Sequence, residues 1–174
     1  MRIAFIGGGH MTTSLVGGLR ARGAAAEDLC VSDPVAAQRE RLEFDFGVRT
    51  TSANAEAVRV ADLVVLAVKP QDMAAAAQSI AAELATRRRI VVSIAAGIRV
   101  ANLLHWLGGD TPVVRTMPNR PALIGAGITA AYAGPGIGHA DRAAVERVLS
   151  TAGLLVWVDD ESQMDVVTAV SGSG

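Results

Sequence analysis

The chain has 174 residues, of which 51% are hydrophobic, and this length suits one domain or one domain with part of another. Its 16 basic and 17 acidic residues nearly cancel, which argues against a surface built for nucleic acid or for an anionic membrane. The apolar runs are far shorter than a bilayer span, and the first residues lack the pattern of a signal peptide. We therefore expect a cytoplasmic protein that binds neither nucleic acid nor a membrane.

The first residues combine a short strand, a glycine turn and a helix. Residues 3–6 form an apolar run of strand length, three glycines follow, and from Met11 onward apolar residues recur at helical spacing. Gly7, Gly9 and Thr12 stand where a dinucleotide-binding fingerprint has its three small residues. Gly7 would allow the sharp turn, and Gly9 would leave room for a pyrophosphate at the helix N-terminus. Thr12 departs from the usual glycine or alanine, and a glycine turn without a ligand is the alternative.

The rest of the chain alternates strand-like and helix-like segments. This repetition predicts an α/β fold, a Rossmann-type doubly wound and mostly parallel sheet with helices on both faces. The looser pattern after residue 110 leaves open whether the last strands run antiparallel. Strands are expected at residues 29–33, 47–50, 63–68, 89–94, 112–117, 128–132 and 154–158, helices at 35–46, 53–59, 73–84, 100–107, 140–151 and 162–170, and a loop at 118–127.

Ligands of such folds bind at the carboxyl ends of the parallel strands, so polar residues there are candidates. Asp33 lies 24 residues after Gly9, where a carboxylate accepts hydrogen bonds from the adenosine ribose and repels a 2′-phosphate. A turn residue before Pro34 is the alternative. Lys69 follows an apolar strand and would hold a phosphate, a ribose or a substrate carboxylate, unless it is an ordinary surface lysine. Asn54 would bind adenosine or cap its helix.

The sequence does not assign a catalytic residue or a metal site. His10 lies in the glycine loop, where its side chain would touch a cofactor, and the other histidines are scattered. No Ser-His-Asp order, no carboxylate pair and no metal-ligand spacing stands out. Hydride transfer needs none of these, because the cofactor carries the reaction and the protein supplies orientation.

Four motifs and the closing residues together resemble pyrroline-5-carboxylate reductase. The motifs are Ile-Gly-Gly-Gly-His-Met at 6–11, Ala-Val-Lys-Pro-Gln at 67–71, Ser-Ile-Ala-Ala-Gly-Ile at 93–98 and Arg-Thr-Met-Pro-Asn-Arg-Pro-Ala at 115–122, followed by residues 164–174 ending in Ser-Gly-Ser-Gly. The resemblance implies reduction of 1-pyrroline-5-carboxylate to L-proline, the last step of proline biosynthesis, with NADP(H) or NAD(H). It also implies a homo-oligomer that binds a small-molecule substrate.

Carried over position by position, the resemblance implies a cofactor site and a nicotinamide side. Two departures are His10, where many relatives have Asn, and Arg120, where many have Thr. The cofactor site would comprise Ile6, Gly7, Gly8, Gly9, His10, Met11, Ser32, Asp33, Asn54, Ala67, Val68, Lys69, Pro70, Ala95, Ala96 and Gly97, and the nicotinamide side Met117, Pro118 and Asn119.

Members of this family continue into an all-helical domain that forms the dimer and binds the substrate. The resemblance therefore implies a dinucleotide-binding Rossmann domain at residues 1–160 and the start of a truncated helical domain at 161–174, so that this chain alone binds cofactor only. Two alternatives are a nucleotide-binding module without catalysis and another NADP-dependent reductase of the hydroxyacid dehydrogenase type. The Met-Pro-Asn and Ser-Gly-Ser-Gly motifs argue against the second.

Overall fold

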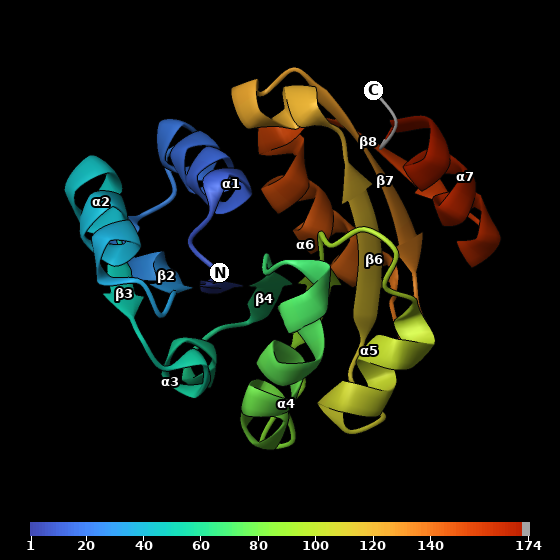
Figure 1. The fold of residues 1–174 in the computed structure, drawn as a ribbon, viewed down its shortest axis with the longest axis horizontal. Coiled ribbons are helices and arrows are strands. Elements are labelled where there is room, and N and C mark those ends of the chain that lie inside the picture. The colour runs from blue at the N-terminus through green and yellow to red at the C-terminus, as the bar shows by residue number, and fades with distance from the viewer. Residues whose placement is uncertain (172–174) are drawn as a thin grey trace.

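The computed structural model describes residues 1–171, in which helices cover both faces of one eight-stranded sheet (Figure 1). The strands are β1 (Ile3–Ile6), β2 (Leu29–Ser32), β3 (Arg49–Thr51), β4 (Leu63–Leu66), β5 (Ile90–Ser93), β6 (Val113–Pro118), β7 (Gly127–Ala133) and β8 (Gly153–Val158). Their order across the sheet is β3-β2-β1-β4-β5-β6-β7-β8. Strands β1 to β6 run parallel, β7 is antiparallel to β6, and β8 is parallel to β7. The predicted fold class is confirmed, and the last two strands are the ones that reverse direction.

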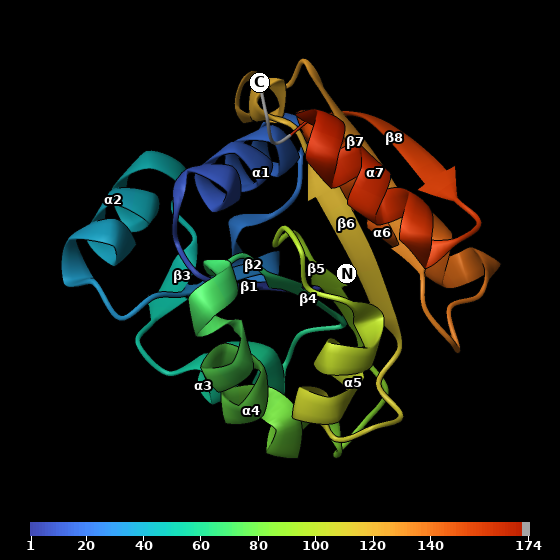
Figure 2. The same ribbon diagram turned by 45° about the vertical axis from the view of Figure 1, so that its right-hand side comes forward.

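Two apolar cores sandwich the sheet, because the first, buried strands present apolar side chains to both faces. One core receives α1 (His10–Ala21), α2 (Ala36–Phe46) and α6 (His139–Leu149). The other receives α3 (Asn54–Arg59), α4 (Met73–Leu84) and α5 (Val100–Leu107). The last helix, α7 (Glu161–Ser171), lies against β6, β7 and β8 (Figure 2). No helix within residues 1–171 is both long and apolar enough to span a bilayer.

The segment at residues 118–127, predicted to be a loop, contains a short 3₁₀ helix, Arg120–Ile124. Tertiary packing explains the difference, since Ala122 is fully buried and its carbonyl oxygen accepts a 2.9 Å hydrogen bond from the Ser14 hydroxyl of α1. The helix predicted at 140–151 ends earlier, at Leu149, and a 3₁₀ turn, Ser150–Ala152, follows it. The strands and the other α-helices match their predicted positions within about two residues at each end, whereas two short 3₁₀ helices, Ala26–Asp28 and Pro70–Asp72, were not predicted.

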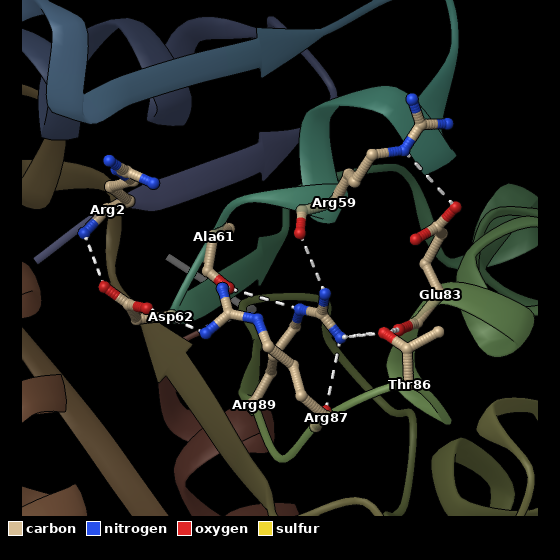
Figure 3. Close-up of polar contacts among 8 residues, drawn as sticks. All are labelled: Arg2, Arg59, Ala61, Asp62, Glu83, Thr86, Arg87 and Arg89. Atoms are coloured by element: carbon tan, nitrogen blue, oxygen red, sulfur yellow. Dashed lines mark hydrogen bonds and ion pairs between the residues drawn. The ribbon is translucent and has the colours of Figure 1, made fainter.

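A buried arginine ties two helix ends to the amino-terminal edge of the sheet (Figure 3). Arg89 is only 3% exposed, and its guanidinium donates hydrogen bonds to the carbonyl oxygens of Arg59, Ala61 and Glu83 and to the Thr86 hydroxyl. Arg59 ends α3 and Glu83 lies in the last turn of α4, where carbonyl oxygens lack partners within their own helices. The positive charge of Arg89 also interacts favourably with the negative, carboxyl-terminal ends of both helix dipoles.

A second buried arginine fixes α7. The Arg115 side chain on β6 is 2% exposed and forms ion pairs with Glu161, at 3.1 Å, and with Asp165, at 2.7 Å. Glu161 also accepts a 2.7 Å hydrogen bond from the Val100 backbone N–H at the start of α5. Met164, between the two acids, is fully buried. The amino-terminal turns of α7 are therefore held against the sheet by both charge and apolar packing, while Gly172, Ser173 and Gly174 of the closing motif lie outside the described residues.

Candidate functional site

A cavity of about 560 Å³ opens at the carboxyl ends of β1, β2 and β4. The chain proceeds from β1 to β2 and β3 on one side of β1 and then returns to place β4 on the other side. The strand order thus reverses at this point, which is where open α/β sheets bind their ligands. We call this cavity the strand-end pocket. Its lining consists of Ile6, Gly7, Gly9, Ser32, Asp33, Pro34, Val35, Asn54, Ala67, Val68, Lys69, Asp72, Ala75 and Ala76.

The turn after β1 depends on Gly7 and Thr12. Gly7 has φ +102°, a conformation that side chains disfavour, and a Cβ there would lie 2.7 Å from the Ala67 carbonyl oxygen. Thr12 is fully buried, and its hydroxyl donates a 2.6 Å hydrogen bond to the Gly7 carbonyl oxygen. The hydroxyl therefore stabilises the turn, which explains how a threonine is accommodated at the third fingerprint position.

Gly9 leaves open space at the start of α1. It is extended, with φ −71° and ψ −175°, and a Cβ built on it would meet no atom within 4 Å. No side chain within residues 1–171 caps α1, so the N–H groups of its first turn are available to an external acceptor. Free N–H groups and the positive dipole end attract anions, and Gly9 leaves room for one to approach. These features fit the pyrophosphate of a dinucleotide.

Asp33 connects the end of β2 to the glycine turn. Its carboxylate accepts hydrogen bonds from the backbone N–H groups of Gly8, at 2.7 Å, and Val35, at 2.8 Å. Arg39 of α2 donates a 2.7 Å hydrogen bond to the Asp33 carbonyl oxygen. Asp33 thus stabilises the turn before Pro34, which was the alternative role considered for it, and it also lines the strand-end pocket. The Gly8 N–H is consequently engaged within the protein.

Lys69 and Asn54 stand on other sides of the strand-end pocket. Lys69 is exposed and forms no ion pair within residues 1–171, so its charge is free to meet an anion. Asn54 begins α3, and its side-chain oxygen accepts a 2.6 Å hydrogen bond from the buried Ser32 hydroxyl. Its side chain does not cap the helix. The pocket therefore combines the Lys69 cation, two carboxylates, Asp33 and Asp72, and the Asn54 amide near the N-terminus of α1.

Several predicted residues lie outside the lining of the strand-end pocket. His10 borders a smaller neighbouring cavity with Leu123, and Met11 packs against the apolar core. Asn119 accepts a 3.0 Å hydrogen bond from the Ile128 backbone N–H, so its side chain closes the turn between β6 and β7. The others are Gly8 and Pro70, which flank lining residues, Ala95, Ala96 and Gly97, which follow β5, and Met117 and Pro118, which end β6.

Sequence reasoning missed five lining residues, Pro34, Val35, Asp72, Ala75 and Ala76. The helical spacing of residues 73–84 predicts α4 but does not show which of its residues border a cavity. A further cavity of about 450 Å³ lies near the amino-terminal edge of the sheet and is bordered by residues 87–89. These three arginines already bond to groups of the protein. The Arg88 guanidinium, for example, lies 2.7 Å from the Asp141 carboxylate. Within residues 1–171 no group of acidic, histidine or cysteine side chains could hold a metal ion.

Comparison with known proteins identifies the family. Residues 2–97, more than half of the chain, match the family model described as NADP oxidoreductase coenzyme F420-dependent. The chain belongs to this family. The matched residues contain β1 to β5 and all fourteen lining residues of the strand-end pocket. The strand-end pocket therefore lies within the part of the chain that the family model describes.

The full chain is also similar to curated pyrroline-5-carboxylate reductases. It is 50% identical over 173 residues to the enzyme of Pseudomonas aeruginosa and 40% identical over 172 residues to that of Vibrio alginolyticus. Each alignment covers 99% of this chain and 63% of the relative. The resemblance read from the motifs is confirmed, and the chain spans less than two thirds of the length of these relatives.

Solved structures agree with this similarity. A pyrroline-5-carboxylate reductase from Coxiella burnetii superposes with a TM-score of 0.96 at 34% identity, covering 99% of this chain and 64% of the other. The Plasmodium falciparum pyrroline carboxylate reductase, solved with NADP bound, gives a TM-score of 0.86 at 26% identity over 100% of this chain and 63% of the other. The fold and the order of its elements are thus those of the corresponding part of these reductases.

Proposed function

We propose that this chain forms the dinucleotide-binding part of a pyrroline-5-carboxylate reductase, which reduces 1-pyrroline-5-carboxylate to L-proline in the last step of proline biosynthesis. The observation that carries the proposal is the strand-end pocket, which lies at the reversal of the strand order in a chain 50% identical to such a reductase. The small-molecule substrate and the reaction rest on that similarity. The capacity to bind NADP(H) or NAD(H) rests on the lining of the pocket.

Each part of the strand-end pocket has a role in this proposal. The first turn of α1 and Gly9 hold the pyrophosphate, since the N–H groups there lack a side-chain cap. Asp33 and Asn54 meet the adenosine ribose, and Lys69 supplies positive charge to a phosphate. Residues 95–97 and 117–119, at the carboxyl ends of β5 and β6, border the nicotinamide side.

A bound reduced nicotinamide supplies the hydride, and the protein contributes orientation and exclusion of water. The imine must be protonated before it accepts a hydride, and this protonation can occur in water, so we assign no general acid to residues 1–171. The chain's own contribution is to hold the dinucleotide through the N-terminus of α1 and the ends of β1, β2 and β4.

The proposal includes a division of the protein into two parts. Residues 1–160 form the dinucleotide-binding domain, and residues 161–174 begin a helical domain that completes the substrate site and forms a homo-oligomer. The ion pairs of Arg115 with Glu161 and Asp165 hold the first turns of α7, where the second part is proposed to begin, against the sheet. The protein is proposed to act in the cytoplasm without nucleic-acid or membrane partners, in keeping with its nearly balanced charge.

The test is a chimera in which residues 1–174 replace the matching part of the Pseudomonas aeruginosa reductase. We expect the chimera to oxidise NADPH or NADH in the presence of 1-pyrroline-5-carboxylate and to form proline. The chain alone should bind the dinucleotide but turn over slower by several orders of magnitude, because an unheld substrate loses the advantage of orientation. Equal turnover by the chain alone would contradict the division into two parts. A folded chimera with no activity would contradict the proposed reaction.

A further inference from the structure

Asn54 lies in the middle of a chain of hydrogen bonds that crosses from β2 to α4. The Ser32 hydroxyl donates to the Asn54 side-chain oxygen at 2.6 Å. The Asn54 amide nitrogen donates to the Ser79 hydroxyl oxygen at 2.9 Å, and the Ser79 hydroxyl donates to the Ala76 carbonyl oxygen at 2.7 Å. Ser32, Asn54 and Ala76 line the strand-end pocket, whereas Ser79 is outside its lining.

The direction of every bond in this chain follows from the Ala76 carbonyl. A carbonyl oxygen only accepts hydrogen bonds, so the single hydroxyl hydrogen of Ser79 is used there. The Ser79 hydroxyl oxygen can then only accept a hydrogen bond from Asn54. The group of Asn54 that faces Ser79 must therefore be the amide nitrogen, which donates, and not the side-chain oxygen. The Asn54 oxygen is thereby left for Ser32, whose hydroxyl is fully buried and needs an acceptor. The two serines together fix which way the Asn54 amide is turned.

We propose that Ser79 is a positioning residue that acts on the cofactor through Asn54. With its amide fixed, Asn54 keeps one N–H and one lone pair of its oxygen for a ligand in the strand-end pocket. A donor and an acceptor on one planar group match two neighbouring hydroxyls, and the ligand class is the ribose diol of an adenine dinucleotide. This inference rests on the proposed function, because the dinucleotide itself is part of that proposal.

The test is a calorimetric titration of the 174-residue chain with NADH, which carries a free ribose diol. Ser79→Ala should weaken binding about two- to tenfold, the range for one hydrogen bond of modest net worth. Ser79→Thr keeps the hydroxyl and should restore the affinity. Gln78→Ala, on the neighbouring exposed position of α4, is the matched control and should bind as the wild type does.

A double substitution separates positioning from a direct contact of Ser79 with the ligand. If Ser79 acts through Asn54, adding Ser79→Ala to Asn54→Ala should weaken binding no further. Additive losses, or unchanged binding by Ser79→Ala, would overturn the positioning role. NMR of the ligand-free protein gives a second readout, in which Ser79→Ala should move the Asn54 side-chain amide signals while Ser79→Thr leaves them near their wild-type positions. Unmoved signals in Ser79→Ala would also overturn it.

The same experiments separate this inference from the function on which it rests. Failure of the wild-type chain to bind NADH at millimolar concentration would contradict the proposed function, and with it the assignment of the ribose as ligand. Normal wild-type binding that Ser79→Ala leaves unchanged would contradict only the positioning role.

Discussion

Gly9 and Gly138 each stand directly before a helix, α1 and α6 respectively. Only Gly9 borders the pocket proposed to bind the cofactor. Both are extended, and neither has a protein atom closer than 3.8 Å to the place a Cβ would occupy. Gly9 borders the strand-end pocket and Gly138 does not. Gly9→Val should therefore abolish NADH binding without unfolding the protein, because its side chain would fill the space proposed for the pyrophosphate. Gly138→Val is the control and should bind normally in the same titration, and equal affinities in the two variants would contradict a pyrophosphate beside Gly9.

Asp33 is the residue whose charge should set the choice between the two cofactors. Its carboxylate is held in the strand-end pocket by the Gly8 and Val35 N–H groups, so it cannot swing away from a 2′-phosphate. Asp33→Asn should raise the ratio of NADPH to NADH affinity by about fivefold or more, because two like charges 4 Å apart repel by roughly 1 kcal/mol even in water. Parallel titrations with both cofactors measure the ratio. An equal rise in Asp72→Asn, which removes another acid from the pocket lining, would show that the total charge and not Asp33 decides.

Local sequence patterns predicted the strands and helices well, because these elements depend on residues that are close together in the sequence. The turn at Gly7 follows from a glycine with positive φ after an apolar run, and the buried strands β4 and β5 follow from continuous apolar sequence. Nine of the fourteen lining residues of the strand-end pocket were predicted from the sequence, and all of these except Asn54 lie at or just after the end of a strand. The pairing of Arg115 with acids 46 and 50 residues later depends on the fold that brings α7 back to β6. The bond between Asn54 and Ser79, 25 residues apart, depends likewise on how α3 packs beside α4.

At the scale of elements, Arg89 should contribute more to stability than the arginines beside it. Arg89→Met would leave the carbonyl oxygens at the ends of α3 and α4 without their donor in a buried place, and we expect a loss of about 3 kcal/mol. Arg87→Met is the matched control (Figure 3), because the Arg87 side chain is 43% exposed, pairs with an exposed Asp62, and bonds to the Ala61 carbonyl oxygen, which keeps its bond from Arg89. It should cost about 1 kcal/mol or less. Urea unfolding measures both, and similar losses would contradict the role given to Arg89.

The start of α6 should make stability depend on pH. Asp141 has a side chain 12% exposed, and it accepts hydrogen bonds from the Arg88 guanidinium and from the Gly138 backbone N–H. Chiefly the bonds from Arg88, and then the one from Gly138, hold the pKa of Asp141 below its ordinary value. A carboxyl with a lowered pKa in the folded state stabilises the fold above its unfolded pKa, and this contribution is lost as the pH falls through the folded value.

Asp141→Asn should accordingly lower the free energy of unfolding at pH 7 by about 1–2 kcal/mol. The difference from wild type should shrink as the pH falls below about 4, because this carboxyl becomes protonated in the unfolded wild-type chain before it does in the folded protein. Asp45→Asn, in an exposed pair with Arg41, serves as the control and should change the free energy by about 0.5 kcal/mol or less at either pH. A difference for Asp141→Asn that stays constant down to pH 2 would contradict the ionic part of its role.

At the scale of the whole molecule, the two ends of the parallel strands differ in whether their polar groups are bonded within the protein. At the amino-terminal edge, Arg87, Arg88 and Arg89 bond to carbonyl oxygens near helix ends and to acids, so the charges of these three arginines are used within the protein. Within the described residues 1–171, the carboxyl-terminal edge keeps an uncapped helix, a lysine without an ion pair and a glycine with open space beside it. A dinucleotide should therefore bind at the carboxyl-terminal edge, although each edge has a cavity of similar size.

The measurement that tests this most directly is an NMR titration of the ¹⁵N-labelled chain with NADH. Saturable shifts are expected at the backbone amides of Gly9, His10 and Met11 and at those of Asp33, Asn54 and Lys69. The amides of residues 87–89, 107, 108, 110 and 111, around the cavity at the opposite edge, should stay unmoved. Shifts confined to that opposite cavity, or no saturable shifts at millimolar NADH, would contradict the account of the strand-end pocket as a dinucleotide site.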